Sequence, residues 1–364
     1  MEQYQNLVKR ILQNGNYRPN RTASDTISTF SQHYEIDLQE GFPLLTTKDL
    51  SGFRWRSLIH ELIWYFSGEH HIREFRKESK IWDAWADENH NLPTAYGRFW
   101  RRYPIPEGDD QLEGEWWVSN LEQWSDDAED WYGDVSKEEI QEGMSRWVNE
   151  EEDGRKTLDQ IQYAIDTLNG EHPYRGPESR RIIITAWHPS NAVVSKLPPC
   201  HFTYVLNVQD GKLNCHLTQR SADTALGVPF NIAAYALITK IIAKQTDFEP
   251  GKFSHTLVDA HVYCGKGERG EWYSENLEKL QEKISDAEER EDYLEIKKWV
   301  DENAPEEDEE GYDHVPNLLE QLSREPRERP EMSISEKDID DLRFDDFKLK
   351  NYDPHPGLKF SVAE

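Results

Sequence analysis

Apolar positions near the start of the chain recur at the spacing of an amphipathic helix. Tyr4, Leu7, Val8, Ile11 and Leu12 share one face of such a helix, and Gly15 follows them. We therefore predict an opening helix that ends at a glycine cap. The polar loop NYRPNRTASDT comes next and leads into the alternation of apolar and polar residues that is typical of a strand.

Two later segments are apolar over the length of a helix. FRWRSLIHELIWYF, residues 53–66, is nearly continuous in apolar side chains and carries Glu61 inside it. NIAAYALITKIIAKQ, residues 231–245, is apolar almost all round, which is typical of a buried helix. We predict that both are core helices. An acid inside such a helix requires a reason, because carboxylates are rarely buried without a partner.

Strand patterns occupy the stretch between these two segments. RRIIITAW and HFTYVLNVQDGKLNCHLTQRS read as β-strands, and QDGK is a hairpin turn within the second segment. Strands and helices are mixed without regular βαβ alternation. The pattern therefore favours an α+β architecture with a mixed sheet and packed helices over a doubly wound one.

Composition narrows the class of protein. The chain has 364 residues, 36% of them hydrophobic and 12% aromatic, which is enough for a substantial core. It contains no apolar run of the roughly 18 residues that a membrane span needs, and its start lacks the features of a signal peptide. We expect a cytoplasmic globular protein. Cys200, Cys215 and Cys264 are an odd number without zinc-type spacing, so we expect thiols, with no disulfide framework and no structural metal.

The formal net charge of −29 is concentrated in two segments. Residues 107–157, the first acidic block, hold about eighteen acids against four bases, and residues 264–312, the second acidic block, about eighteen against seven. Such a charge argues against nucleic acid or an acidic membrane as the main partner. Two interpretations stay open: adaptation to a salt-rich cytoplasm, or a pair of solvated surface excursions.

The two blocks differ in their predicted order. The first is rich in tryptophan, so we expect it to pack onto something despite its charge, whereas the run from Glu306 to Glu310 should be mobile. The tryptophans concerned are Trp116, Trp117, Trp124, Trp131 and Trp147.

The four residues PPCH precede one of the predicted strands. Proline fixes the backbone, so PPC places Cys200 where a strand begins, at an edge or in a cleft. That position suits a nucleophile, although a cysteine near a strand is more often a small buried hydrophobe. His201 adds little, because adjacent side chains on a strand point to opposite faces.

Polar residues downstream strengthen the interpretation of Cys200 as a nucleophile. QRSAD supplies Arg220, Ser221 and Asp223, and GVPFN ends at Asn231. An arginine beside a thiol lowers its pKa, and arginine with a serine hydroxyl is suited to binding phosphate. Each residue also has a structural alternative: an ion pair for Arg220, a turn for Asp223 and a helix N-cap for Asn231.

These motifs together resemble the thymidylate synthase family. The resemblance rests on LPPCHFTYVL, LTQRSADTALGVPFNIAAYAL and VDAHVY, and extends to NRT, GFPLLTTK, LIHELIWYFSG, IWDAWADENHNLPTAYGRFW, SRRIIITAW, LSREPRERP and RFDDFKLKNYDPHPGLKFSVAE. Only the two acidic blocks fall outside it. It implies one catalytic domain over residues 1–364, carrying the blocks as insertions, in a homodimer with stacked sheets.

The resemblance implies reductive methylation of dUMP to dTMP, with 5,10-methylenetetrahydrofolate as co-substrate and dihydrofolate as product. Cys200 would add to C6 of the uracil, because C5 alone is a poor nucleophile. Asn231 would contact the O4 and N3 edge of the uracil. Arg220, beside the thiol, would serve both catalysis and phosphate binding.

The remaining site residues are also implied by the resemblance. Arg21, Ser221 and the pair Arg180 and Arg181, lent by the partner subunit, would join Arg220 at the phosphate. Further groups would serve the rest of the substrate, proton transfer and the folate. They are His261 and Tyr263 at the ribose, Asp223 at the substrate, Glu61 and Tyr96 in proton transfer, and Trp82, Trp85, Asp223, Gly227 and the tail with Ala363 at the folate.

The chain departs from the family pattern near the predicted ribose ligands. After HVY the family usually continues with an Asn-His pair, whereas this chain resumes at DHVPNLL with Asp313 in place of the asparagine.

The nearest rival function is that of a pyrimidine hydroxymethylase of the same fold, and Asn231 and Trp82 argue against it. The other rival is a nucleotide-binding protein without catalysis, against which the retention of Cys200, Glu61 and Asn231 argues.

Overall fold

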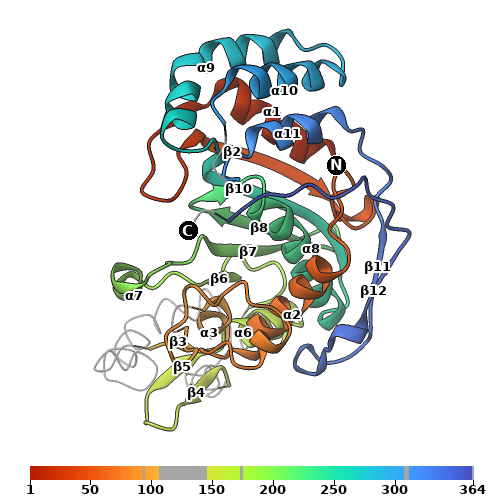
Figure 1. Cartoon of the computed structure of the whole chain (residues 1–364). Coiled ribbons are helices and arrows are strands. Elements are labelled where there is room, and N and C mark those ends of the chain that lie inside the picture. The colour runs from red at the N-terminus through yellow and green to blue at the C-terminus, as the bar shows by residue number, and fades with distance from the viewer. Residues whose placement is uncertain (93–94, 106–145, 173–174, 307–310, 363–364) are drawn as a thin grey trace, which may run out of the picture.

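The computed structural model describes residues 1–92, 95–105, 146–172, 175–306 and 311–362. A central sheet has its strands in the order β1, β2, β10, β8, β7, β6, and β9 pairs with the end of β10 (Figure 1). The bounds are β1 Asn16–Arg18, β2 Thr26–Asp37, β6 Ile183–Thr185, β7 His201–Gln209, β8 Lys212–Gln219, β9 Ala222–Asp223 and β10 Glu249–Tyr263.

The sheet is mixed, as the sequence predicted. Strand β10 runs parallel to β8 and β9 and antiparallel to β2, while β7 is antiparallel to β8 and β6. The predicted hairpin joins β7 to β8, and Asp210 and Gly211 in its turn have φ values of 51° and 71°. Positive φ at both central residues is what a type I′ turn requires. The α+β prediction is confirmed.

Helices cover one face of this sheet. The longest apolar one, α8, contacts β8, β10 and α2, and its side chains are buried almost all round, as predicted. The α-helices have the bounds α1 Glu2–Asn14, α2 Phe53–Ser67, α3 Tyr96–Arg101, α6 Gln160–Leu168, α7 Pro189–Val194, α8 Gly227–Gln245, α9 Glu268–Asp286, α10 Asp292–Asn303 and α11 Val315–Ser323. Short 3-10 helices are η1 Leu38–Glu40, η2 Phe75–Lys77, η3 Ile339–Asp341 and η4 Phe344–Asp346.

The opening helix α1 ends before Gly15, as predicted, but the glycine is needed for space and not for a left-handed backbone. Its φ is −72°, which any residue can adopt. A Cβ atom there would lie 2.5 Å from the carbonyl oxygen of Ile11 and 2.6 Å from a methyl group of Ile27. The close passage of α1 over β2 therefore requires glycine.

The described end of the first acidic block folds onto the body of the protein. Strands β4 (Val148–Glu150) and β5 (Lys156–Leu158) form a small sheet with β3 (Tyr103–Pro104). Trp147 is buried, stacks on His172 and donates from Nε1 to Asp166 at 2.8 Å. The expectation that this tryptophan packs is confirmed. Trp116, Trp117, Trp124 and Trp131 lie outside the described residues.

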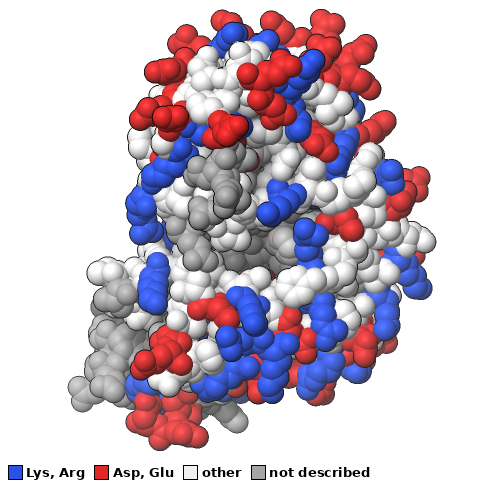
Figure 2. Space-filling model, in the orientation of Figure 1, with Lys and Arg blue, Asp and Glu red and all other residues white. Residues whose placement is uncertain are grey.

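The second acidic block forms the helices α9 and α10, which pack on α1 and α11. Figure 2 shows acidic side chains gathered over these helices, at the top of the view. The block leaves and rejoins the body at one place, because Cys264 and Asp313 form an antiparallel bridge. The predicted mobile run from Glu306 to Glu310 lies almost entirely outside the described residues, with only Glu306 inside them.

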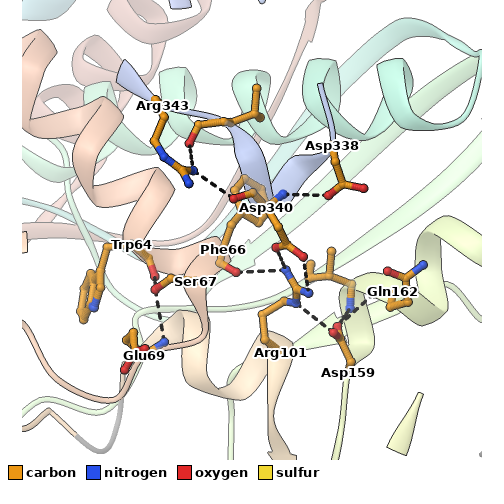
Figure 3. Close-up of polar contacts among 12 residues, drawn as sticks. Trp64, Phe66, Ser67, Glu69, Arg101, Asp159, Gln162, Asp338, Asp340 and Arg343 are labelled. Atoms are coloured by element: carbon orange, nitrogen blue, oxygen red, sulfur yellow. Dashed lines mark hydrogen bonds and ion pairs between the residues drawn. The ribbon is translucent and has the colours of Figure 1, made fainter. Parts of the chain in front are cut away.

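The C-terminal part of the chain closes over the helical side of the molecule. A two-stranded sheet, β11 (Glu331–Ile334) with β12 (Phe347–Lys350), flanks η3 and η4. Arg101 at the end of α3 ties this part down (Figure 3). Its guanidinium donates to Asp159 at 2.9 Å, to the Phe66 carbonyl at 3.0 Å and to Asp340 at 2.5 Å. One side chain therefore connects α2, α3, α6 and η3.

We expect Arg101→Met to lower the free energy of unfolding by about 3 kcal/mol. The change strands the largely buried carboxylate of Asp159, and breaking a buried pair from one side costs a few kcal/mol. Urea unfolding followed by circular dichroism measures this. As a control, Lys298→Met removes only an exposed pair with Glu302 and should change the free energy by less than about 0.5 kcal/mol. Equal effects of the two substitutions would contradict this role of Arg101.

Candidate functional site

Cys200 lies immediately before β7, where the backbone is fixed from two sides. The Arg220 amide donates to the Cys200 carbonyl at 2.9 Å, and the Cys200 amide donates to the Tyr96 hydroxyl oxygen at 2.8 Å. Strand β7 lies between β8 and β6, so the sheet-edge alternative for Cys200 is wrong. The thiol is mostly buried at an interior strand end.

The Arg220 guanidinium occupies the place beside this thiol. It donates from Nε to the Pro199 carbonyl at 2.9 Å and from Nη2 to the Pro198 carbonyl at 2.5 Å, and Nη2 lies 3.5 Å from Cys200 Sγ. Within the described part of the chain, Arg220 binds carbonyls and the thiol in place of a carboxylate, so the ion-pair alternative is wrong. Burial raises the pKa of Cys200, and the charge of Arg220 opposes that rise.

His201 points away from the thiol, as the sequence predicted. Its ring stacks on Tyr96 at 3.6 Å between centroids, with an interplanar angle of 2°, and its Nδ1 lies 2.8 Å from the Tyr235 hydroxyl. Burial lowers the pKa of His201 to about 3, so the imidazole is neutral. This stack fixes Tyr96, which in turn fixes the backbone of Cys200.

Glu61 has the partner that its position in an apolar helix required. Trp82 Nε1 donates to Glu61 Oε1 at 2.6 Å. Burial raises the pKa of this carboxyl to about 7, while the hydrogen bonds from Trp82 and Tyr65 oppose the rise. The Trp82 ring also packs against Trp85 and Tyr96, with centroids 5.5 and 6.0 Å away. The acid thus lies beside a wall of aromatic rings.

Asp223, Gly227 and Asn231 come together at the start of α8. A Cβ atom on Gly227 would lie 3.7 Å from Asn231 Oδ1 and 3.9 Å from Asp223 Cβ. The Asp223 carboxylate accepts the amides of Ala225 and Leu226, which confirms the turn alternative for this residue. Helix α8 begins at Gly227, so Asn231 lies within it and the N-cap alternative is wrong.

His261 and Tyr263 lie near the end of β10, and His261 is opposite Asp223 in the parallel register with β9. His261 Nδ1 lies 3.2 Å from Asp259 Oδ1, and its ring meets Tyr263 edge-on at 5.3 Å. Burial raises the pKa of Tyr263, and the charges of Asp223 and Cys200 add to the rise. The Tyr263 hydroxyl therefore interacts electrostatically with the thiol of Cys200 and the carboxylate of Asp223.

The described part of the C-terminal tail ends beside these residues. His314 Nε2 lies 2.9 Å from the Ser361 carbonyl, and the Phe360 ring is 5.1 Å from His314. His314 in turn contacts Tyr263, with ring centroids 5.4 Å apart. Ala363 lies outside the described residues, so its predicted contact with the folate has no structural account.

Ser221 and Arg21 differ in their exposure to solvent. Ser221 follows Arg220 and is partly buried, and its carbonyl accepts from Gln219. Arg21 is exposed in the loop between β1 and β2.

The structure does not bring Arg180 and Arg181 to Cys200 of the same chain. Both are exposed and precede β6, whose Ile183 lies opposite Val205 of β7. That register places the pair toward the far end of β7, roughly 20 Å along the strand from Cys200.

Lys48 is a buried residue near Asp223 and the C-terminal tail for which the sequence pattern predicted no role. Its side chain is buried, and Nζ donates to the Ala225 carbonyl and lies 4.6 Å from the centre of the Phe360 ring. Burial lowers the pKa of Lys48 to about 7, and the charge of Asp223 opposes the shift. In the sequence, Lys48 directly follows the apolar run GFPLLTT, and this position is the feature that could have indicated a buried lysine.

The described residues contain neither a metal-binding cluster nor a membrane-spanning helix. No group of three or more His, Cys, Asp or Glu side chains is arranged to hold a metal ion. No helix among them is both long enough and apolar enough to cross a bilayer.

Comparison with known proteins decides the family. Residues 2–364 match the family described as thymidylate synthase. The chain belongs to the thymidylate synthase family. The thymidylate synthase of Haloferax volcanii is 54% identical over 360 residues, which cover 98% of this chain and 95% of that protein. An alignment of that extent includes both acidic blocks. The chain is therefore a methyltransferase that converts dUMP to dTMP, and the family uses methylenetetrahydrofolate as co-substrate.

We expect Glu61→Gln to stabilise the protein at pH 8 more than at pH 5. The ordinary pKa of a glutamate is 4.5, and in the fold it is about 7, so the folded state binds the proton more tightly. Stability from this group is complete below pH 4.5 and is lost as the pH rises through 7. Glutamine does not ionise, so the variant does not lose this stability as the pH rises. Melting temperatures at the two pH values measure the effect, and a difference between variant and wild type that does not change with pH would contradict it.

Proposed function

We propose that Cys200 is the nucleophile that adds to C6 of dUMP. The addition makes C5 electron-rich enough to attack the one-carbon unit, which uracil alone does poorly. The supporting observation is the setting of the thiol: Arg220 Nη2 lies 3.5 Å from Sγ, and the diproline carbonyls hold that guanidinium in place. A cation fixed beside this partly buried thiol favours the thiolate that the reaction needs.

Asn231 is the proposed reader of the uracil edge. It lies in the second turn of α8, next to Gly227 and Asp223. An amide can donate to O4 and accept from N3–H, and this pairing distinguishes uracil from cytosine. A hydrogen bond to O4 also stabilises the negative charge that develops there after the thiolate adds.

Arginines are the proposed ligands of the dUMP phosphate. Arg220 and Ser221 supply the site at the end of β8, and Arg21 reaches it from the loop between β1 and β2. Arg180 and Arg181 contribute from a second copy of the chain, which agrees with their position away from Cys200 of their own chain. Charge-assisted hydrogen bonds from several guanidinium groups suit a dianion on an otherwise acidic protein.

His261 and Tyr263 are the proposed ligands of the ribose hydroxyl. The Asp259 carboxylate fixes the His261 ring through Nδ1 and is itself paired with Arg18. The ring of Tyr263 leans on His261 and His314, which limits its movement.

Glu61 and Tyr96 are the proposed proton-transfer groups. A carboxyl whose pKa is about 7 can both give and take a proton near neutral pH. Trp82 fixes one of its oxygens, so the orientation of the acid is set before substrate arrives. Tyr96 is held by the Cys200 amide and the His201 stack at the other side of the same cluster.

The folate supplies the one-carbon unit and the hydride when bound, and the proposed contacts are Trp82, Trp85, Asp223, Gly227 and Ala363. The tryptophans offer flat apolar surface on which a pterin can stack and from which water is excluded. Gly227 carries no side chain between Asp223 and Asn231, where a Cβ atom would lie 3.9 Å from Asp223 Cβ and 3.7 Å from Asn231 Oδ1.

The active form is proposed to be a homodimer in which the central sheets stack. The sheet face opposite α8 is lined by polar and apolar side chains that no described helix covers, and these include Val205, Asn207, Asn214, His216, Ser254, Lys252 and Glu35. Stacking this face on a second copy would cover it and bring Arg180 and Arg181 to the partner's phosphate site. A cytoplasmic location stays a prediction.

The acidic blocks are proposed to suit the protein to concentrated salt. Carboxylates gathered over α9 and α10 (Figure 2) repel one another, and counter-ions screen that repulsion within a few ångströms at molar salt. The formal net charge of −29 makes this repulsion large.

We expect Cys200→Ser to abolish dihydrofolate formation, since a serine hydroxyl is a far weaker nucleophile than a thiolate. Absorbance of purified protein with dUMP and methylenetetrahydrofolate measures the product. The wild type should show a rise that depends on dUMP and is larger in molar KCl than in dilute buffer. Unchanged activity of the variant would contradict the role of Cys200, and hydroxymethyl-dUMP formed without dihydrofolate would favour the hydroxymethylase.

Mixing two inactive variants tests the shared site. Cys200→Ser leaves Arg180 and Arg181 intact, whereas the double variant Arg180→Glu with Arg181→Glu leaves the thiol intact. In a mixed dimer one of the two sites then has both the thiol and the arginine pair, so random exchange should restore about a quarter of wild-type activity. No recovery after unfolding and refolding the mixture together, with each variant shown to be dimeric, would contradict the partner role of the arginines.

A further inference from the structure

The loop that carries Arg21 is held by residues of the second acidic block. The ammonium group of Lys266 donates to the carbonyl of Asn20 at 2.9 Å and to the carbonyl of Thr22 at 2.5 Å. These are the residues on either side of Arg21. Lys266 therefore bridges the backbone at the point from which the arginine projects.

A second set of contacts fixes the base of the same loop. The Asp25 amide donates to the Gly265 carbonyl at 2.8 Å, and the Gly265 amide donates to the buried Ser24 hydroxyl at 3.0 Å. The Asp25 carboxylate accepts from the Asn20 amide and from the Tyr17 hydroxyl, both at 2.8 Å. The loop is thus closed on itself and tied to the start of the block.

Close packing continues these contacts into helix α9. A Cβ atom on Gly270, in the first turn of the helix, would lie 2.8 Å from Asp25 Oδ2. Any side chain at this position would displace the Asp25 carboxylate, which accepts hydrogen bonds from Asn20 and Tyr17. The position of the loop and the position of the helix therefore depend on each other.

The block itself is anchored by a buried charge cluster. Arg269 pairs with Asp313 at 2.7 Å, and the Tyr273 hydroxyl donates to the same carboxylate at 2.7 Å. Asp313 is the residue that replaces the usual asparagine of the family, and the guanidinium of Arg269 gives the replacement a physical reason. The cluster fixes the two ends of the block, and with them Gly265 and Lys266.

We propose that the second acidic block holds the Arg21 loop in its phosphate-binding conformation, with Lys266 as the positioning residue. The inference rests on the proposed role of Arg21 at the dUMP phosphate. A loop ordered before binding spares the substrate the entropy cost of ordering it, so the block contributes affinity for dUMP and leaves the chemical step unchanged. The block thus acts on the substrate site through the Arg21 loop and does not contact the substrate itself.

The test is the kinetics of Lys266→Met. The variant loses both backbone contacts, and we expect the KM for dUMP to rise about tenfold, which equals about 1.4 kcal/mol, with kcat and the KM for the folate within about twofold. Inhibition by inorganic phosphate, competitive with dUMP, should weaken in the same proportion. Trypsin should cut after Arg21 faster than in the wild type. Lys266→Arg, which can still donate to both carbonyls, should restore most of the affinity.

Two further variants separate this inference from the function on which it rests. Lys298→Met changes a residue of α10 in the same block that pairs with Glu302. It should leave the KM for dUMP unchanged, and an equal rise there would overturn the inference. Arg21→Met should raise that KM at least as much as Lys266→Met. If Arg21→Met raises it and Lys266→Met does not, the positioning role is wrong while the proposed function stands. If neither raises it, the proposed role of Arg21 is wrong as well.

Discussion

The guanidinium of Arg220 is the group on which the arrangement of the site depends. It donates to the carbonyls of Pro198 and Pro199 and approaches the thiol of Cys200. The backbone amide of Arg220 also donates to the Cys200 carbonyl. Prolines offer carbonyls without competing amide donors, so the strand start is built to receive a cation. Tyr96 closes the other side through the Cys200 amide. A loss of this contact set would free the proposed nucleophile, Cys200, and the proposed phosphate ligand, Arg220, together.

Burial sets the electrostatics around that contact set. It raises the pKa of Glu61 to about 7 and lowers the pKa of Lys48 to about 7. A carboxyl group and an amine therefore both titrate near neutral pH. Hydrogen bonds from Trp82 and Tyr65 limit the rise at Glu61, and the charge of Asp223 limits the fall at Lys48. The same desolvation that weakens the charged forms strengthens each hydrogen bond to a reacting group. Two side chains that titrate near neutral pH therefore lie among the residues of the proposed site.

Much of this architecture could be predicted from the sequence, because periodicity and turn chemistry act locally. The helices at Glu2–Asn14 and Phe53–Ser67 and the turn at Asp210 and Gly211 each follow from a few neighbouring residues. The interior position of β7 and the start of α8 before Asn231 could not, since strand order and helix ends depend on distant contacts. The sequence indicated that Glu61 needs a partner, because carboxylates are rarely buried without one. It could not identify Trp82 Nε1 as the donor, since that contact requires two segments to meet in space. Lys48 was missed because a lysine next to an apolar run reads as exposed.

The most direct measurement is the site of covalent attachment of the nucleotide. A dUMP analogue with fluorine at C5 cannot lose a proton there, so with methylenetetrahydrofolate it should remain attached to the nucleophile. Peptide mass mapping after proteolysis identifies the attached residue. We predict one adduct, on the peptide that carries Cys200, and none on the peptides with the buried thiols Cys215 and Cys264. An adduct on either of those cysteines, or no adduct in a preparation that forms dihydrofolate from dUMP, would contradict it.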